Sequence, residues 1–98
     1  MAAYMIVLCQ IHDRDRFVSE YAQPTAKLIA SHGGEYVLRA PGVISLEGGF
    51  GDGMSAVISK WPDKAAIEGF WNSPEYKDLK TKRRSVSDAQ VMIVEANA

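Results

Sequence analysis

Hydrophobic positions along the chain follow two patterns, uninterrupted runs and helical spacing, and together they predict a series of short elements. Residues 4–12 are apolar at almost every position, contain no Gly or Pro, and form a run too short for a helix. Such a run is typical of a strand that is buried on both faces. Residues 54–61 and 90–95 predict two further strands.

Helical spacing of apolar residues marks two regions between these strands. The first begins after Asp13, a suitable N-cap, and ends at two consecutive glycines, and Pro24 within it predicts a kink or a split near residue 22. The second begins after Asp63 and is interrupted at Ser73 and Pro74, where a serine cap and a proline in the first helical position restart the helix. We expect one bent helical region there.

Residues 35–40 and 43–47 are two short strand-like runs separated by Pro41 and Gly42, a pair suited to a type II turn. The sequence leaves two alternatives open here, a hairpin and one bent strand. Residues 48–53 are rich in glycine. The segment leads into a predicted strand and not into a helix N-terminus, which argues against a phosphate-binding loop. We interpret it as a flexible connection and a candidate lid over a cleft.

The order strand, helix, strand, strand, helix, strand predicts an α+β fold of the ferredoxin-like type, with a four-stranded antiparallel sheet in one domain over residues 1–98. Two helical regions cover only one face of such a sheet. Because the strands are apolar on both faces, the other face would be a larger apolar patch than monomers usually expose. A second copy of the chain, related by a two-fold axis, is the simplest cover, so we expect a homodimer.

The net charge of the chain argues against nucleic acid and anionic membranes as partners. The chain has 11 Lys and Arg against 12 Asp and Glu, a net charge of −1, so no overall field attracts nucleic acid or an anionic membrane. The one basic run, at residues 80–84, fits the solvated face of a helix. Neither a secretory leader nor a membrane-spanning run is recognised, and we expect a cytoplasmic protein.

The lone Cys9 lies inside an apolar run and is expected to be a buried small hydrophobe in a reducing compartment. Cys9 and His12 are spaced like some metal ligands, but three positions along a strand place their side chains on opposite faces. The sequence has no further cluster of ligands. We therefore expect neither a metal site nor a cofactor.

Several motifs together resemble a bacterial family called domain of unknown function thirteen-thirty, within the dimeric α+β barrel superfamily. The resemblance spans almost the whole chain and rests on MAAYMIV (1–7), Tyr21, HGGEYVLR (32–39), LEG (46–48), WNSPEY (71–76), Arg83, Val94 and Glu95. It implies two ferredoxin-like units with their sheets face to face, each with a cleft between sheet and helices, and no established activity. The chain departs from the family pattern at Gly49 and Phe50, where an acidic residue and a tryptophan are common, and at Ala96, where a glycine is usual.

Tyr76 and Arg83 lie seven residues apart, and therefore on one helical face that should otherwise be core. In a polar cleft, Arg83 or Arg39 would hold a carboxylate or an enolate in bidentate fashion. The alternative is that Arg83 extends its guanidinium to water and that Tyr76 is an aromatic residue at the rim. Arg39 and Glu47 flank the same turn, where an ordinary cross-strand ion pair is the simpler interpretation.

Trp71 and Ser73 precede the helix break and are candidate lining residues, although a core tryptophan and a capping serine explain both without a ligand. Our first hypothesis is a homodimer that binds a small anionic or aromatic metabolite in the cleft. Its candidate ligand-binding residues are Arg39, Trp71, Ser73, Tyr76 and Arg83.

Two further hypotheses remain open. One is a cofactor-independent monooxygenase or isomerase, by analogy with enzymes of the same superfamily, with His32 or Glu47 as the candidate general base. The other is a structural or partner-binding module without turnover, in which the dimer surface is the whole function.

Overall fold

Strands and helices follow one another in the order that the sequence predicts. The structure, a computed structural model, describes residues 1–97. Its elements are β1 (Ala3–Ile11), α1 (Arg14–Arg16), η1 (Phe17–Ala22), α2 (Gln23–Ser31), β2 (Glu35–Ala40), β3 (Ser55–Trp61), α3 (Lys64–Trp71), α4 (Pro74–Val86) and β4 (Ser87–Glu95). The four strands form one antiparallel sheet in the order β2-β3-β1-β4, which confirms the predicted ferredoxin-like α+β fold.

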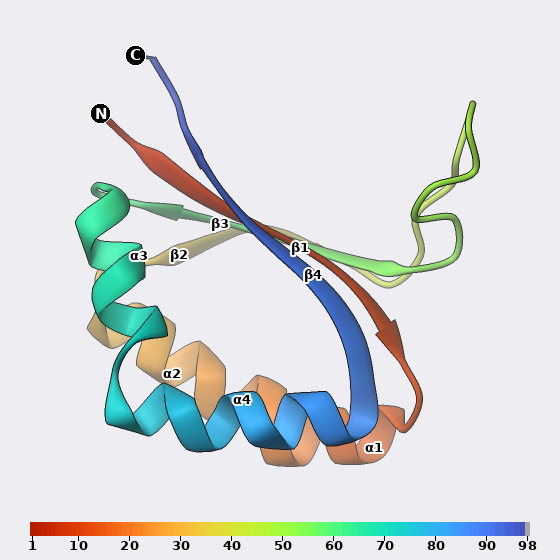
Figure 1. The fold of residues 1–98 in the computed structure, drawn as a ribbon, viewed down its shortest axis with the longest axis horizontal. Coiled ribbons are helices and arrows are strands. Elements are labelled where there is room, and N and C mark those ends of the chain that lie inside the picture. Colours follow the sequence, from red (N-terminus) through yellow and green to blue (C-terminus); the bar gives the residue numbers. More distant parts are fainter. Residues whose placement is uncertain (98) are drawn as a thin grey trace.

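The helices cover one face of this sheet. Figure 1 shows them gathered beneath it, whereas the loop between β2 and β3 and the two chain ends rise on the opposite side. The core between sheet and helices is centred on four side chains that are at most 2% exposed: Trp61, Ile67, Phe70 and Tyr76. The ring centre of Phe70 lies 5.3 Å from that of Trp61 and 4.4 Å from that of Tyr76, so aromatic contacts join β3 to α3 and α4.

The predicted helix caps are confirmed. Asp13 accepts a hydrogen bond from the backbone N–H of Arg16 at 3.1 Å, and Asp63 accepts one from Ala66 at 2.8 Å. Ser73 caps α4 in the same way, and Pro74 occupies its first turn. None of the helices described in residues 1–97 is long and apolar enough to cross a bilayer.

The first helical region contains an unusually wide turn. η1 is a π-helix of six residues, and the N–H of Gln23, which follows it, donates to the carbonyl of Val18. Pro24, which has no N–H to donate, then falls in the first turn of α2. The break predicted near residue 22 is thus a change from π to α geometry, and π turns are frequent at functional sites.

The strand predicted at residues 43–47 is wrong. β2 pairs directly with β3, and residues 41–54 between them form a projecting segment, here called the β2–β3 arm. At its base the N–H of Val43 donates to the carbonyl of Met54, and the N–H of Gly53 donates to that of Val43, both at 2.8 Å. Beyond this base the arm finds no strand to pair with, and Ile44 and Leu46 are 83% and 98% exposed.

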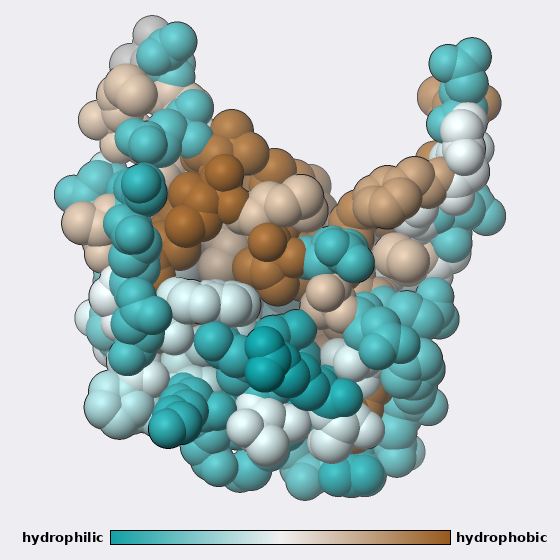
Figure 2. Space-filling view, viewed as in Figure 1, coloured by the Kyte–Doolittle hydropathy of each residue, from teal (hydrophilic) through white to brown (hydrophobic). Residues whose placement is uncertain are grey.

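The face of the sheet opposite the helices is apolar, as the strand patterns predict. The register places Ile6 opposite Ile58 on one side and opposite Met92 on the other. We call this surface the open face; its apolar members include Ile6, Leu8, Ile58, Met92 and Val94. Figure 2 shows hydrophobic surface gathered in the hollow between the arm and the chain ends, where no helix covers it.

Candidate functional site

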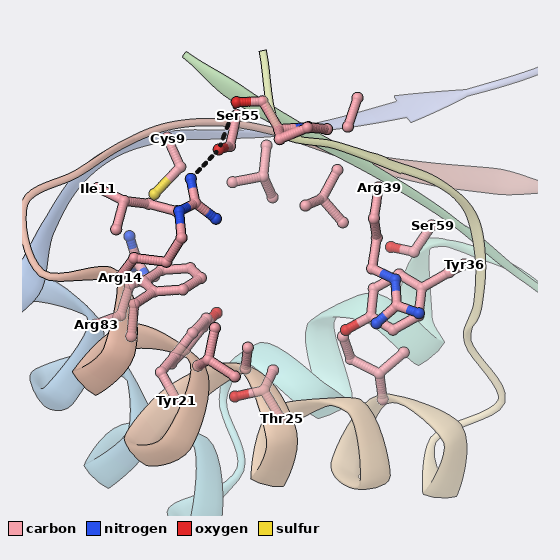
Figure 3. A pocket seen from close by; sticks show the side chains of 18 of the residues that line it. Cys9, Ile11, Arg14, Tyr21, Thr25, Tyr36, Arg39, Ser55, Ser59 and Arg83 are labelled. Atoms are coloured by element: carbon pink, nitrogen blue, oxygen red, sulfur yellow. Dashed lines mark hydrogen bonds between the residues drawn. The ribbon is translucent and has the colours of Figure 1, made fainter.

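A cleft of about 270 Å³ lies between the helix-facing side of the sheet and the helices η1 and α2. Its walls are mostly apolar because alternate residues of β1 and β3 point into it while their neighbours point to the open face. Figure 3 shows Arg14 and Arg83 at one end of the hollow, Tyr36 and Arg39 at the other, and Tyr21 and Thr25 on the helical floor.

Arg83 is the most unusual group in this lining. It projects from α4, is only 5% exposed, and its Nε has no hydrogen-bond partner. Among residues 1–97 no carboxylate forms an ion pair with it. Thr25 Oγ1, also in the lining, is likewise buried without a partner. Buried polar groups are nearly always paired, so two unpaired groups on side chains that line one cleft make these side chains candidates for contact with a polar ligand atom.

Two tyrosine hydroxyls meet at the Tyr21 side chain, and Arg83 lies near the ring of the same tyrosine. The Oη atoms of Tyr21 and Tyr76 are 2.8 Å apart, and Arg83 Cζ lies 6.0 Å from the centre of the Tyr21 ring. Burial raises the pKa of Tyr21 well above its ordinary value, and the neighbouring Tyr76 raises it further, whereas Arg83 opposes the shift. Tyr21 therefore stays a neutral phenol that can donate a hydrogen bond.

The opposite end of the cleft is formed by a more exposed arginine. Arg39 is exposed, and its Cζ lies 4.6 Å from the centre of the Tyr36 ring, a cation–π contact that holds the guanidinium near the mouth. The ion pair predicted between Arg39 and Glu47 is not formed among the described residues, because Glu47 lies out on the β2–β3 arm. Arg14 donates to Ser55 Oγ at 3.3 Å and so bridges α1 to β3.

Cys9 is buried, as predicted, at 3% exposure, and it lines the same cleft. Burial raises the pKa of its thiol, and a hydrogen bond with Ser87 and the charge of Arg83 only partly oppose this. The thiol is therefore neutral near pH 7, which makes it a weak nucleophile.

The predicted site residues fall in two groups. Arg39 and Arg83 line the cleft, whereas the other five candidates do not. Tyr76 is 2% exposed and reaches the cleft only through its hydrogen bond to Tyr21. Ser73 caps α4, and the ring of Trp71 lies 4.0 Å below Lys80 Nζ.

His32 and Glu47, the candidate bases, lie away from the cleft. The His32 ring packs edge-on against Phe70 with centres 6.1 Å apart, and Glu47 is exposed on the arm. No carboxylate or imidazole belongs to the lining formed by residues 1–97, so neither candidate base is among the groups that this cleft presents. The glycine-rich segment lies on the other side of the sheet, and its predicted role as a lid over this cleft is wrong.

Sequence reasoning missed Tyr21, Thr25 and Tyr36 as lining residues. The sequence marks Tyr21 as an apolar position of a helix and as part of the family resemblance, and the π-helix that carries it leaves no pattern at helical spacing. Residues 1–97 contain no group of three or more His, Cys, Asp or Glu side chains placed to bind a metal.

The chain belongs to the family described as Domain of unknown function (DUF1330), whose model matches residues 2–97. The predicted membership is therefore confirmed. A comparison with curated proteins finds no match.

Solved structures share the fold at low sequence identity. A protein of unknown function from Rhodopseudomonas palustris has a TM-score of 0.78 at 14% identity, over 99% of this chain and 83% of its own. SnoaB, a cofactor-independent oxygenase from Streptomyces nogalater, has a TM-score of 0.72 at 19% identity, over 99% and 94%. A dimeric ferredoxin-like protein of unknown function from Jannaschia sp. CCS1 has a TM-score of 0.73 at 14% identity, over 98% and 100%. These likenesses establish the fold alone.

Proposed function

We propose that the protein is a homodimer that binds a small, largely apolar molecule carrying one negatively charged oxygen, with that oxygen at Arg83 in the cleft. The observation that carries the proposal is the guanidinium of Arg83, buried to 5% exposure, with Nε unpaired and no carboxylate against it. A buried charge without a partner is costly, and an anion from outside would supply the missing partner.

The rest of the cleft sets the size and character of the ligand. A volume of about 270 Å³ is near the lower end of the range for small-molecule pockets, so it suits a compact body such as one aromatic ring with short substituents. Apolar contacts would hold that body against the side chains that β1 contributes to the lining, which include Met5, Val7 and Cys9. Arg39 at the mouth would attract anions before they enter.

The open face supports the dimer. Met92 and Val94 are 40% and 45% exposed within a continuous apolar surface, and the arm beside it carries Leu46 and Phe50, which are 98% and 71% exposed. Exposed apolar area of this extent is typical of an interface. A second copy of the chain is the partner we propose, because a two-fold axis would place one open face against another, and the neighbour from Jannaschia is described as dimeric.

Ligand binding is tested by isothermal titration calorimetry with benzoate, against benzamide as a neutral molecule of the same shape. Benzoate should bind the wild-type protein and benzamide should not bind detectably, because only the anion pairs with Arg83. Arg83→Gln should lose benzoate binding. Arg84→Gln is the matched control, since it removes an exposed arginine from the next position of α4.

Equal affinity for benzoate and benzamide, or an unchanged benzoate affinity in Arg83→Gln, would overturn the proposal. Absence of binding by benzoate, phenylacetate and salicylate alike would do the same.

A further inference from the structure

We propose that Tyr21 is the second donor to the same ligand oxygen as Arg83, and that Tyr76 fixes the direction in which Tyr21 donates. This rests on the proposed binding of an anion in the cleft and deepens it. The site would thus recognise an oxyanion on an apolar body, such as a phenolate, an enolate or a carboxylate, through one guanidinium and one phenol.

The direction of the tyrosine pair follows from counting protons. Each hydroxyl carries one proton, and the two Oη atoms are 2.8 Å apart, so one hydroxyl donates to the other. Tyr76 is 2% exposed, and within residues 1–97 its hydroxyl has no partner other than Tyr21. If Tyr21 donated to Tyr76, the proton of Tyr76 would be buried without an acceptor, which is the costly arrangement. Tyr76 therefore donates to Tyr21.

The consequence is that the proton of Tyr21 is left for the cleft. Tyr21 lines the cleft and Tyr76 does not, and Figure 3 shows the Tyr21 side chain rising from the helical floor toward the hollow. No described group accepts this proton. By accepting a bond from Tyr76, Tyr21 also becomes a better donor, because hydrogen bonds in a chain polarise one another.

Arg83 supplies the charge at the same end of the cleft. Its Cζ is 6.0 Å from the centre of the Tyr21 ring, and both side chains belong to the lining. A guanidinium and a phenol at one end of a mostly apolar cleft favour an anionic oxygen over a neutral one, since charge-assisted hydrogen bonds are the stronger ones. The raised pKa of Tyr21 keeps the phenol protonated and able to donate near pH 7.

The test uses para-nitrophenol, a one-ring probe whose anion absorbs visible light and whose neutral form does not. Bound to the wild-type protein, the probe should ionise at lower pH than it does in water, because the site stabilises its anion. Tyr21→Phe should weaken binding of the anion about 10- to 100-fold, the range for one hydrogen bond to a charged group, and should reverse part of the shift in ionisation.

Two further variants separate positioning from direct contact. Tyr76→Phe should weaken binding of the anion by less than Tyr21→Phe does. In Tyr76→Phe, Tyr21 keeps its own proton and loses only the hydrogen bond that it accepts from Tyr76. Tyr4→Phe removes a hydroxyl from the opposite face of the sheet and is the matched control, with the affinity and ionisation of the wild type expected. A thermal melt verifies that each variant is folded.

The outcomes distinguish this inference from the function on which it rests. If neither para-nitrophenol nor benzoate binds the wild type, both are overturned. If the wild type binds the probe, Arg83→Gln does not, and Tyr21→Phe binds and ionises it like the wild type, only the role of Tyr21 is overturned. If Tyr21→Phe weakens nitrophenolate and leaves benzoate unchanged, Tyr21 serves phenolates or enolates; if it weakens both, carboxylates use it too.

Discussion

Replacing Arg83 by Met should make the ligand-free protein more stable while removing its ability to bind an anion. The unpaired Nε costs about 1–3 kcal/mol of folding free energy, the usual penalty for a buried donor without a partner. Methionine keeps an unbranched apolar stem in the same space. The change also loses the contact with the Tyr21 ring, which at 6.0 Å lies at the outer limit of a cation–π interaction and for that reason is worth only about 0.5–1 kcal/mol. We therefore expect a net gain of about 1 kcal/mol.

Urea unfolding at one fixed protein concentration measures this gain, because the stability of the proposed dimer would depend on concentration. For a chain of this length, about 1 kcal/mol corresponds to a rise of roughly 4–8 °C in the midpoint of a thermal melt. Arg84→Met, at an exposed position, is the control and should change little. Benzoate at about 100 times its Kd should raise the unfolding free energy of the wild type by about 2.7 kcal/mol and leave that of Arg83→Met unchanged. With benzoate the wild type should therefore be more stable than Arg83→Met, the reverse of the order without ligand.

The reasoning is refuted if Arg83→Met is less stable than the wild type by about 1 kcal/mol or more without ligand, on the scale of a lost native interaction. That result would mean that the guanidinium is already well satisfied in the free protein and needs no anion.

Three other variants probe the fold, the cleft thiol and the open face. Gly34→Ala should destabilise by about 1–3 kcal/mol in urea unfolding, because its Cβ would lie 2.7 Å from an Ile29 methyl, whereas Gly42→Ala, with open space around it, should not. Burial raises the pKa of Cys9, so the folded state holds the thiol proton longer than the unfolded chain does. The unfolding free energy of the wild type should therefore fall relative to Cys9→Ala as pH rises through 9.0, the ordinary thiol value, and a constant difference would contradict this. Ile6→Lys should shift sedimentation equilibrium toward monomer, and the same shift in an exposed α3 variant, Ala65→Lys, would point to a nonspecific charge effect.

Local chemistry explains which parts of the fold the sequence predicts well. The caps at Asp13, Asp63 and Ser73 depend only on one side chain and on the backbone N–H three residues later. They can therefore be predicted from a single sequence. The strand predicted at residues 43–47 fails for the opposite reason. Its residues have strand character, but a strand exists only where another strand pairs with it, and β3 is already paired with β2 and β1.

The site is less predictable than the fold because it depends on where helices lie over the sheet. The seven-residue spacing of Tyr76 and Arg83 correctly places both on the inner face of α4. The spacing does not predict that Arg83 lines the cleft, nor that Tyr76 lies behind Tyr21 and contacts it by a hydrogen bond. Tyr21, which lies between Tyr76 and the cleft, comes from the π-helix η1, and no pattern of hydrophobic positions reveals that helix type.

The most direct measurement is a crystal structure of the protein with para-bromobenzoate, whose bromine is located independently by its anomalous signal. We expect the ring in the cleft between β1 and η1, with a carboxylate oxygen within hydrogen-bond distance of the Arg83 guanidinium. A bromine signal confined to the protein surface at saturating ligand, with the cleft holding only solvent, would contradict the account.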